Sequence, residues 1–353
     1  MRFSQFFASF CALRERSPVE KLFPDSRYAI AADLHLGDGG GMDTFGRYRG
    51  LAESVLGAVY LAGGHTLVLA GDTEDLRAFW SKDITQSWPR IYALLDEFAS
   101  QGSLRKLLGE RDLGLIRKQR PRYRFHHGLR LDWEGFEFFV LHGHQAARYF
   151  AGMDYQDFLQ KQLHKPSRIR DEGDMDDAGR LYRTERRLYR ASLRLGIATL
   201  FGHTGRMLFE SRTEYDDLRS SIESLLRRES PKTEEGSSVI DAMLELYRKE
   251  LARMERHGQV PGMTLQAGEE GSLAPCLFNP GFAGGRKGLN FLEIEGGRLR
   301  MVRWVPFARI PRSLRARSLA VDEFEEYGVA RCILRETSLA SVRDRVELLA
   351  RRG

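Results

Sequence analysis

Cysteine is scarce in this chain of 353 residues, which contains only Cys11, Cys276 and Cys332. The number is odd, the spacing is wide, and no C-x-x-C pair is present. These features exclude a disulfide framework and a structural zinc site, and they fit a reducing compartment. No apolar run approaches the roughly 20 residues that a membrane-spanning helix needs. We therefore expect a cytoplasmic protein with no transmembrane segment.

A large excess of charge of one sign is also missing. The chain has 55 basic and 49 acidic residues, which gives a formal charge of +6 that favours anionic ligands only weakly. With 42% hydrophobic and 29% charged residues, the composition is typical of a soluble globular protein. The length suits one large domain, or a core domain that carries insertions.

The N-terminal segment carries phenylalanine at positions 3, 6, 7 and 10, which is helical spacing. It superficially resembles a short signal peptide, but it lacks a small-residue cleavage pattern, and Arg14 and Arg16 follow at once. We expect an amphipathic helix packed on the core rather than a membrane anchor.

Apolar runs alternate with helix-compatible stretches through the first 200 residues, and this alternation predicts an α/β sheet. Helices are expected at Arg49–Ala62 and Trp88–Ser100. Gly296 and Gly297 predict a tight turn between the last two strands. The expected strands are Tyr28–Asp33, Thr66–Ala70, Leu104–Leu108, Phe136–Leu141, Ile197–Phe201, Pro275–Asn279, Gly288–Ile294 and Leu299–Val305.

Two charged helical segments interrupt this rhythm. We expect a core over residues 1–310 that is interrupted by a basic helical cap at 154–195 and by a helical hairpin at 207–268. Residues 311–353 are expected to form a C-terminal helical tail.

Five of the strand-like runs end in residues that bind metals well. The endings contain Asp33 and His35, then Asp72, then Glu110, Arg111 and Asp112, then His142 and His144, and finally His203. The carboxyl ends of strands are where open α/β sheets place their sites. Two divalent cations about 3.5–4 Å apart can clamp a phosphoryl group, and they need a bridging anion such as Asp72 to offset their repulsion. The ordered endings therefore predict a two-metal centre.

The order of these motifs resembles that of the calcineurin-like metallophosphoesterases, over roughly residues 28–305 apart from the insertions. The motifs that carry the resemblance are D-x-H at Asp33, G-D at Asp72, G-x-x-D ending at Asp112, H-G-H at His142 and G-H-T-x at His203. The resemblance implies a two-sheet β-sandwich flanked by helices, with the metal centre at the strand ends. It also implies one metal site from Asp33, His35 and Asp72, and another from Asp72, Glu110, His142 and His203. His144 is expected to support the ligands rather than to bind metal.

Three positions depart from the family's pattern. Glu110 replaces an Asn, and a carboxylate can still ligate a cation. Arg111 replaces a His that is thought to protonate the leaving group; Arg cannot donate its proton near neutral pH, but it can stabilise a developing oxyanion. Gly205 replaces a second His, which leaves the first site with three protein ligands. Arg111 and Asp112 are the candidate catalytic residues.

An arginine stripe runs along the expected helix before His203, at positions 180, 183, 187, 190 and 194. Two interpretations stay open. The stripe can be a solvated face, or it can belong to a cap helix in which Arg183, Arg187 and Arg190 bind substrate phosphate.

We expect a phosphoesterase that uses one or two divalent ions (Mn, Fe, Zn or Mg) and attack by a metal-bound hydroxide. Its substrate would be an anionic phosphate-containing small molecule or lipid. The alternative is a catalytically impaired homologue that acts as a binding or scaffold module, which Arg111 and Gly205 favour. Nucleic acid is not an expected partner, because aromatic residues are sparse in the basic helix and no recognised binding module is present.

Overall fold

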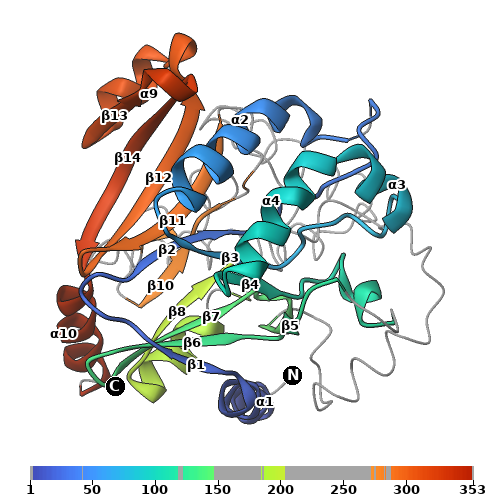
Figure 1. Ribbon diagram of the computed structural model, residues 1–353. Helices are drawn as coiled ribbons and strands as arrows, with labels where there is room; N and C mark the ends of the chain where they lie inside the picture. The colour runs from blue at the N-terminus through green and yellow to red at the C-terminus, as the bar shows by residue number, and fades with distance from the viewer. Residues whose placement is uncertain are drawn as a thin grey trace, which may run out of the picture.

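The protein is a mixed α/β structure built around two multi-stranded sheets (Figure 1). The computed structural model describes residues 3–41, 43–117, 122–146, 184, 187–202, 272–273, 276–281, 283 and 288–351. The expected helical hairpin at 207–268 and most of the expected cap at 154–195 lie outside these residues.

Eight strands of the described chain form the larger sheet, and strands near both ends of the chain meet in its middle. Their spatial order is β13 (Ala320–Phe324), β14 (Val329–Ser338), β12 (Arg298–Pro306), β11 (Leu289–Glu295), β2 (Arg27–Ala31), β3 (Thr66–Ala70), β4 (Leu104–Leu107) and β5 (Phe125–His126).

Six strands of the described chain form the smaller sheet. Their spatial order is β1 (Val19–Lys21), β6 (Leu129–Trp133), β7 (Phe136–Leu141), β8 (Ala198–Phe201), β10 (Leu277–Asn279) and β9 (Ser272–Leu273). In this sheet β7, β8 and β10 run parallel to one another.

Strands β2, β3 and β4 are parallel neighbours, so their carboxyl ends lie at the same edge of the larger sheet. Their side chains alternate between two buried faces. Ile30 and Val68 belong to the core that also includes the smaller sheet, whereas Leu67 and Leu69 belong to the core beneath the helices. Because both faces are buried, these strands read as continuous apolar runs in the sequence.

Helices cover the outer sides of the sheets. In Figure 1, α2 and α4 lie across the larger sheet, and buried residues of both helices share a core with that sheet. Helix α1 packs against the smaller sheet, where the Phe10 ring meets the Phe139 ring edge-on with centroids 5.3 Å apart. Within the described residues, the α-helices are α1 (Phe3–Arg16), α2 (Arg49–Ser54, continued by a π-helical segment over Val55–Leu61), α3 (Ser81–Ser87), α4 (Pro89–Ser100), α9 (Arg312–Arg317) and α10 (Leu339–Ala350).

Several expectations from the sequence are confirmed. Strands β3 and β7 have the predicted bounds, and the other predicted strands are present with ends shifted by one or two residues. The N-terminal helix is present, and its Phe6 and Phe10 are buried in the core. Gly296 and Gly297 form the two-residue turn between β11 and β12, and both have a positive φ, at 57° and 67°.

The expected helical tail over 311–353 is wrong in its middle part. Strands β13 and β14 occupy this region between α9 and α10, and β14 pairs with β12 of the core. The reason is packing, because Ala330 and Cys332 of β14 form a small apolar cluster with Val305 of β12. The tail therefore extends the larger sheet and does not form a separate helical unit.

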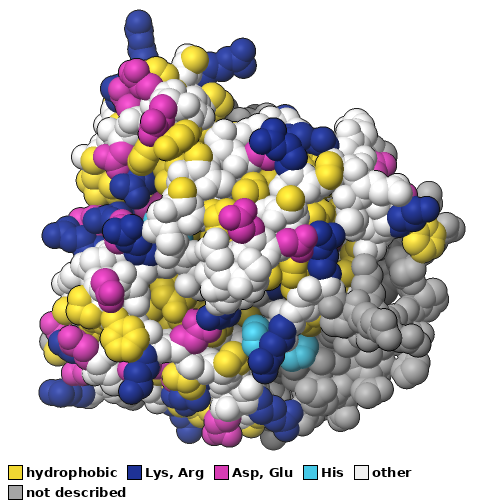
Figure 2. Space-filling model, viewed as in Figure 1, with side chains coloured by type: hydrophobic (Ala, Val, Ile, Leu, Met, Phe, Trp, Pro, Cys, Tyr) yellow, Lys and Arg dark blue, Asp and Glu magenta, His cyan; other side chains and the backbone are white. Residues whose placement is uncertain are grey.

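A search of the described residues finds no helix long and apolar enough to cross a membrane. On the face of the molecule shown in Figure 2, basic and acidic side chains are interspersed, with neither sign dominating.

The contact between α1 and the smaller sheet gives a stability prediction. Replacing Phe10 with Ala should lower the free energy of unfolding by about 3–5 kcal/mol, because a fully buried ring is removed from a packed core. Phe23→Ala is the matched control, since 57% of Phe23 is exposed, and it should change stability by less than about 0.5 kcal/mol. Urea unfolding measures both values, and equal effects would show that α1 is not docked as described.

Candidate metal centre

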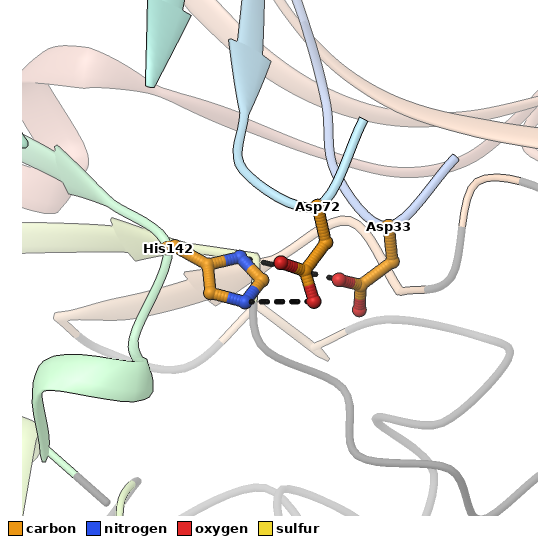
Figure 3. Close-up of side chains that lie close together, drawn as sticks. All are labelled: Asp33, Asp72 and His142. Carbon is orange, nitrogen blue, oxygen red and sulfur yellow. Dashed lines mark ion pairs between the residues drawn. The ribbon is translucent and has the colours of Figure 1, made fainter. Parts of the chain in front are cut away.

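Two buried carboxylates and one buried imidazole meet where the carboxyl ends of both sheets come together. Asp33 follows β2, Asp72 follows β3 and His142 follows β7, as Figure 3 shows. One ligand atom from each residue lies within 4.8 Å of the others. Asp33 and Asp72 are each 2% exposed, and His142 is fully buried. These three strand endings therefore converge, and their role as metal ligands stays a prediction.

The distances fit a shared cation. His142 Nε2 lies 3.5 Å from Asp72 Oδ2, and His35 Nε2 lies 3.6 Å from both Asp33 Oδ1 and Asp72 Oδ2. Metal–ligand bonds of about 2.1 Å separate the donor atoms around one ion by about 3.0–4.2 Å. The observed spacings fall in this range, and the mixture of imidazole and carboxylate donors is compatible with a divalent metal ion.

The ring orientation of His142 is set by a backbone group. Its Nδ1 lies 3.1 Å from the carbonyl oxygen of Ala70, the last residue of β3. A carbonyl can only accept a hydrogen bond, so Nδ1 carries the proton and donates it. Nε2, which faces Asp72, is then the nitrogen that can bind a metal, as is usual when a backbone carbonyl holds a ligating histidine.

The backbone at the site is unusual. Asp33, His35 and Asp72 have φ values of 54°, 51° and 52°, and Glu134 is the one other described residue besides glycine with a positive φ. This conformation is costly for L-residues and tends to persist at functional sites. Parallel pairing continues past the strand ends and holds it, because the Asp33 N–H donates to the Gly71 carbonyl and the His35 N–H to the Asp72 carbonyl.

Glycines make room for the cluster. A Cβ on Gly71 would lie 2.6 Å from the His142 ring, and one on Gly109 would lie 2.0 Å from Asp72 Oδ1. A Cβ on Gly202 would lie 2.2 Å from the Cβ of Ala32. Each of these three glycines directly precedes a predicted ligand, so a larger residue at any of them would clash with its neighbours.

The loop after β4 brings Arg111 to the carboxylates. The backbone N–H of Arg111 donates a hydrogen bond to Asp72 Oδ1 at 2.7 Å, and the side-chain Nε lies 3.9 Å from Asp72 Oδ2. The guanidinium is also bonded to Asp75, at 2.7 Å. The preceding residue, Glu110, is paired with Arg77 at 3.5 Å. Arg111 therefore contacts the carboxylate cluster, and the predicted roles of Glu110 and Arg111 stay predictions.

Asp112, predicted to be catalytic, is fully buried and bonds to the backbone of two loops. Its two oxygens accept hydrogen bonds from the N–H groups of Thr73 and Gly109, at 3.0 and 2.6 Å. Burial, together with the charges of Asp72 and Glu74, raises the pKa of Asp112 to about 7. These contacts indicate that Asp112 holds the loops after β3 and β4 together.

Attraction between oppositely charged neighbours outweighs the effect of burial on the pKa values of the cluster. Burial alone would raise the pKa of both aspartates, but the neighbouring histidines hold the pKa of Asp33 below its usual value and that of Asp72 well below it. Burial alone would lower the histidine pKa values, but the carboxylates raise the pKa of His35 to about 9 and that of His142 to about 10. In the metal-free protein the two imidazoles are therefore protonated at neutral pH.

Several predicted residues are not part of this geometry. His203, Gly205 and Arg183 lie outside the described residues. Residues 187–195 are helical, with Arg190 exposed, and the guanidinium of Arg194 lies over the Phe7 ring of α1 at 4.4 Å. This end of the arginine stripe packs beside α1, and phosphate binding by Arg187 and Arg190 stays a prediction.

A buried carboxylate in the loop after β3, Glu74, was not predicted from the sequence. Glu74 accepts hydrogen bonds from Lys106 of β4 at 2.5 and 2.6 Å and from Tyr92 of α4 at 3.0 Å. It also forms a β-bridge with Leu36, so it joins the loops after β2 and β3. The available signal was a lysine inside an otherwise apolar strand, which requires a buried partner.

Comparison with known proteins gives little further guidance. No protein-family model and no curated protein matches the chain. Among solved structures, it matches a protein of Streptococcus pneumoniae TIGR4 described as a predicted phosphoesterase. The identity is 9%, the match covers 79% of this chain and 89% of the other, and the TM-score is 0.27. A likeness this weak carries no weight, so the case for a function rests on the site.

The tight contact at Gly71 gives a prediction about metal binding. Gly71→Ala should lower the affinity for Mn²⁺ at least about tenfold, because the new methyl group must displace the His142 ring from its ligating position. Gly64→Ala is the control, since Gly64 also has a positive φ, of 68°, but a Cβ there meets nothing within 4 Å. It should cost roughly 1–2 kcal/mol of stability and leave affinity unchanged. Isothermal titration would contradict the geometry if both variants bound Mn²⁺ like the wild type.

The raised histidine pKa values predict proton release on metal binding. Metals bind neutral imidazole, so affinity should rise by up to about tenfold per pH unit for each proton displaced. The rise should continue from pH 6.5 until it flattens near the pKa values of about 9 and 10. Calorimetric titration with Mn²⁺ in buffers of different ionisation enthalpy counts the protons released on binding. The His142→Gln variant should release fewer protons than the wild type. Binding that is independent of pH over this range would rule out these ligands.

The same shifts affect the metal-free fold. A raised histidine pKa stabilises the folded state at pH values below the unfolded pKa, and this contribution is lost as the pH rises through the folded values.

Proposed function

We propose that the protein is a metal-dependent phosphoesterase that hydrolyses an anionic phosphate ester. The observation that carries the proposal is the buried cluster of Asp33, Asp72 and His142, with His35 and Arg111 beside it, at the carboxyl ends of the strands. The arrangement of helices outside two facing sheets supports a metallophosphoesterase-like sandwich, which is the fold that the resemblance of the motifs implies.

The proposed ligands form two groups that share Asp72. Asp33, His35 and Asp72 would hold one divalent cation, and Asp72, Glu110, His142 and His203 would hold another. Such cations lower the pKa of bound water and stabilise the charge on phosphoryl oxygens. One or two ions of Mn, Fe, Zn or Mg are compatible with the donor set.

Arg111 is the proposed catalytic side chain. Burial alone would lower the pKa of Arg111, but the charges of Asp75 and Asp72 outweigh that effect and raise the pKa above its usual value. The guanidinium therefore stays charged and cannot act as a general acid. Asp75 holds the guanidinium in place beside Asp72. A fixed positive charge there can stabilise negative charge that develops on a phosphoryl oxygen, without reorganisation during the reaction.

With metal bound, His35 and His142 would be deprotonated ligands, and Arg111 cannot give up its proton, so none of these three side chains would protonate the leaving group. Substrates with good leaving groups, such as aryl phosphates, should therefore be hydrolysed more readily than alkyl phosphates. The proposed natural substrate class is an anionic phosphate-containing small molecule or lipid.

A second candidate function is metal-dependent binding without turnover. It is favoured by Arg111, which is ion-paired with Asp75 at 2.7 Å and occupies the position where the resemblance implies a proton-donating His. In this case the fold would hold an ion and act as a binding or scaffold module.

An activity assay separates the two functions. We expect Mn²⁺-dependent hydrolysis of p-nitrophenyl phosphate, or of its bis-aryl diester, by the wild type. Asp72→Asn should reduce it at least about 100-fold, because the variant weakens the carboxylate shared by both sites. Asp96→Asn, at an exposed ion pair with Arg122, is the control and should keep wild-type activity. Absence of turnover with every metal would favour the binding module, and equal turnover in Asp72→Asn would point to a contaminant.

A further inference from the structure

The buried ion pair between Glu74 and Lys106 has no role in the proposed mechanism. Lys106 Nζ donates to both carboxylate oxygens of Glu74, at 2.5 and 2.6 Å, and the two residues are only 1% and 3% exposed. The cost of removing two such charges from water can exceed the energy of their attraction, so a buried pair is weak evidence for stability. The contribution of this pair is better sought in the geometry that it fixes.

The contacts of the pair hold both of its side chains in place. Besides Lys106 of β4, the Glu74 carboxylate accepts a hydrogen bond from Tyr92 of α4, at 3.0 Å. Lys106 Nζ lies 5.8 Å from the ring centroids of both Tyr123 and Phe125, where the ring faces attract a positive charge. Strand β4 and helix α4 therefore anchor one side chain of the loop after β3.

That loop is joined by its backbone to both of the nearest proposed ligands. Glu74 follows Asp72 by two residues, and it forms a β-bridge with Leu36, which directly follows His35. The Leu36 N–H donates to the Thr73 carbonyl at 2.8 Å, and the His35 N–H donates to the Asp72 carbonyl at 3.0 Å. A displacement of Glu74 would therefore move the backbone on both sides of these hydrogen bonds.

The backbone of these ligands needs such support. His35 and Asp72 have φ values of 51° and 52°, a conformation that is unfavourable for L-residues and persists only where the surrounding structure enforces it. The backbone hydrogen bonds join the loops after β2 and β3 to each other, whereas the ion pair fastens them to β4.

We propose that Glu74 and Lys106 are positioning residues, which hold the backbone of His35 and Asp72 in the conformation that lets their side chains share a cation. Tyr92 assists them through its hydrogen bond to Glu74. The inference deepens the proposed metal centre and rests on it. The pair then contributes to metal affinity more than to stability.

A double variant, Glu74→Leu/Lys106→Met, tests the proposal because it removes both charges and leaves neither of them unpaired. Its midpoint of urea unfolding should stay close to that of the wild type, since apolar side chains can replace a buried ion pair without loss of stability. Its affinity for Mn²⁺, measured by isothermal titration, should fall about tenfold or more, because the ligands are no longer held in place.

Glu293→Leu/Arg331→Met is the matched control. Glu293 is also a buried carboxylate that accepts hydrogen bonds from a cation and a phenol, namely Arg331 at 3.0 Å and Tyr60 at 2.7 Å. It lies inside β11, opposite Ala29 of β2, where regular strand pairing sets the backbone. This variant should bind Mn²⁺ like the wild type.

Amide hydrogen exchange in the metal-free protein gives a readout that does not depend on metal binding. The N–H groups of His35 and Leu36 should exchange about tenfold faster or more in Glu74→Leu/Lys106→Met, while that of Ile30 within β2 keeps its wild-type rate. If the wild type does not bind Mn²⁺, the proposed metal centre fails, and the exchange rates still decide whether the pair positions these loops.

Tyr92→Phe decides the matter if the double variant does not fold. It keeps the ion pair and removes one hydrogen bond to Glu74, so Mn²⁺ affinity should fall about two- to fivefold. Tyr60→Phe removes a comparable bond to Glu293 and should leave the affinity unchanged. The proposal is overturned if the folded double variant keeps wild-type exchange at His35 and Leu36 or wild-type Mn²⁺ affinity, or if the variants at Glu293 or Tyr60 are equally impaired.

Discussion

The close approach of two buried carboxylates, Asp33 and Asp72, is the constraint on which the rest of the structure depends. Removing two like charges from water and holding them together is unfavourable by several kcal/mol per ion unless positive groups compensate. His35, His142 and Arg111 provide that compensation, and each is close to Asp72. The strained backbone at Asp33, His35 and Asp72, and the glycines beside them, are the local consequences of forcing these groups into one small volume.

The cluster also explains why the fold needs both sheets. Asp33 and Asp72 come from adjacent parallel strands of the larger sheet, whereas His142 comes from the smaller one. The hydrogen bond from the His142 ring to the carbonyl of Ala70 crosses between the sheets, so their packing fixes which imidazole nitrogen faces the carboxylates. The ion pair between Glu74 and Lys106 ties the loop after β3 to β4, and Asp112 joins the loops after β3 and β4. The geometry of the cluster therefore depends on both sheets together rather than on one loop.

Much of this was readable from the sequence, for an identifiable reason. Buried parallel strands are continuous apolar runs, so β3 and β7 were located with their observed bounds, and the residues after them were placed at one edge. The sequence failed where tertiary contacts decide the outcome. Strands β13 and β14 form because Ala330 and Cys332 pack against β12, and local pattern does not report that. Asp112 reads as catalytic from its motif, but its oxygens accept backbone hydrogen bonds. The partners of Glu74 and Arg77 lie 32 and 33 residues away and follow only from the folded loops.

An anomalous diffraction map at the manganese edge, from crystals soaked in Mn²⁺, tests the central claim most directly. The account predicts at least one strong peak that contacts Asp33, Asp72 or both, with His35 or His142 Nε2 completing the shell at about 2.0–2.2 Å. No peak at this position under saturating Mn²⁺, with the carboxylates still bonded directly to protonated histidines, would contradict it.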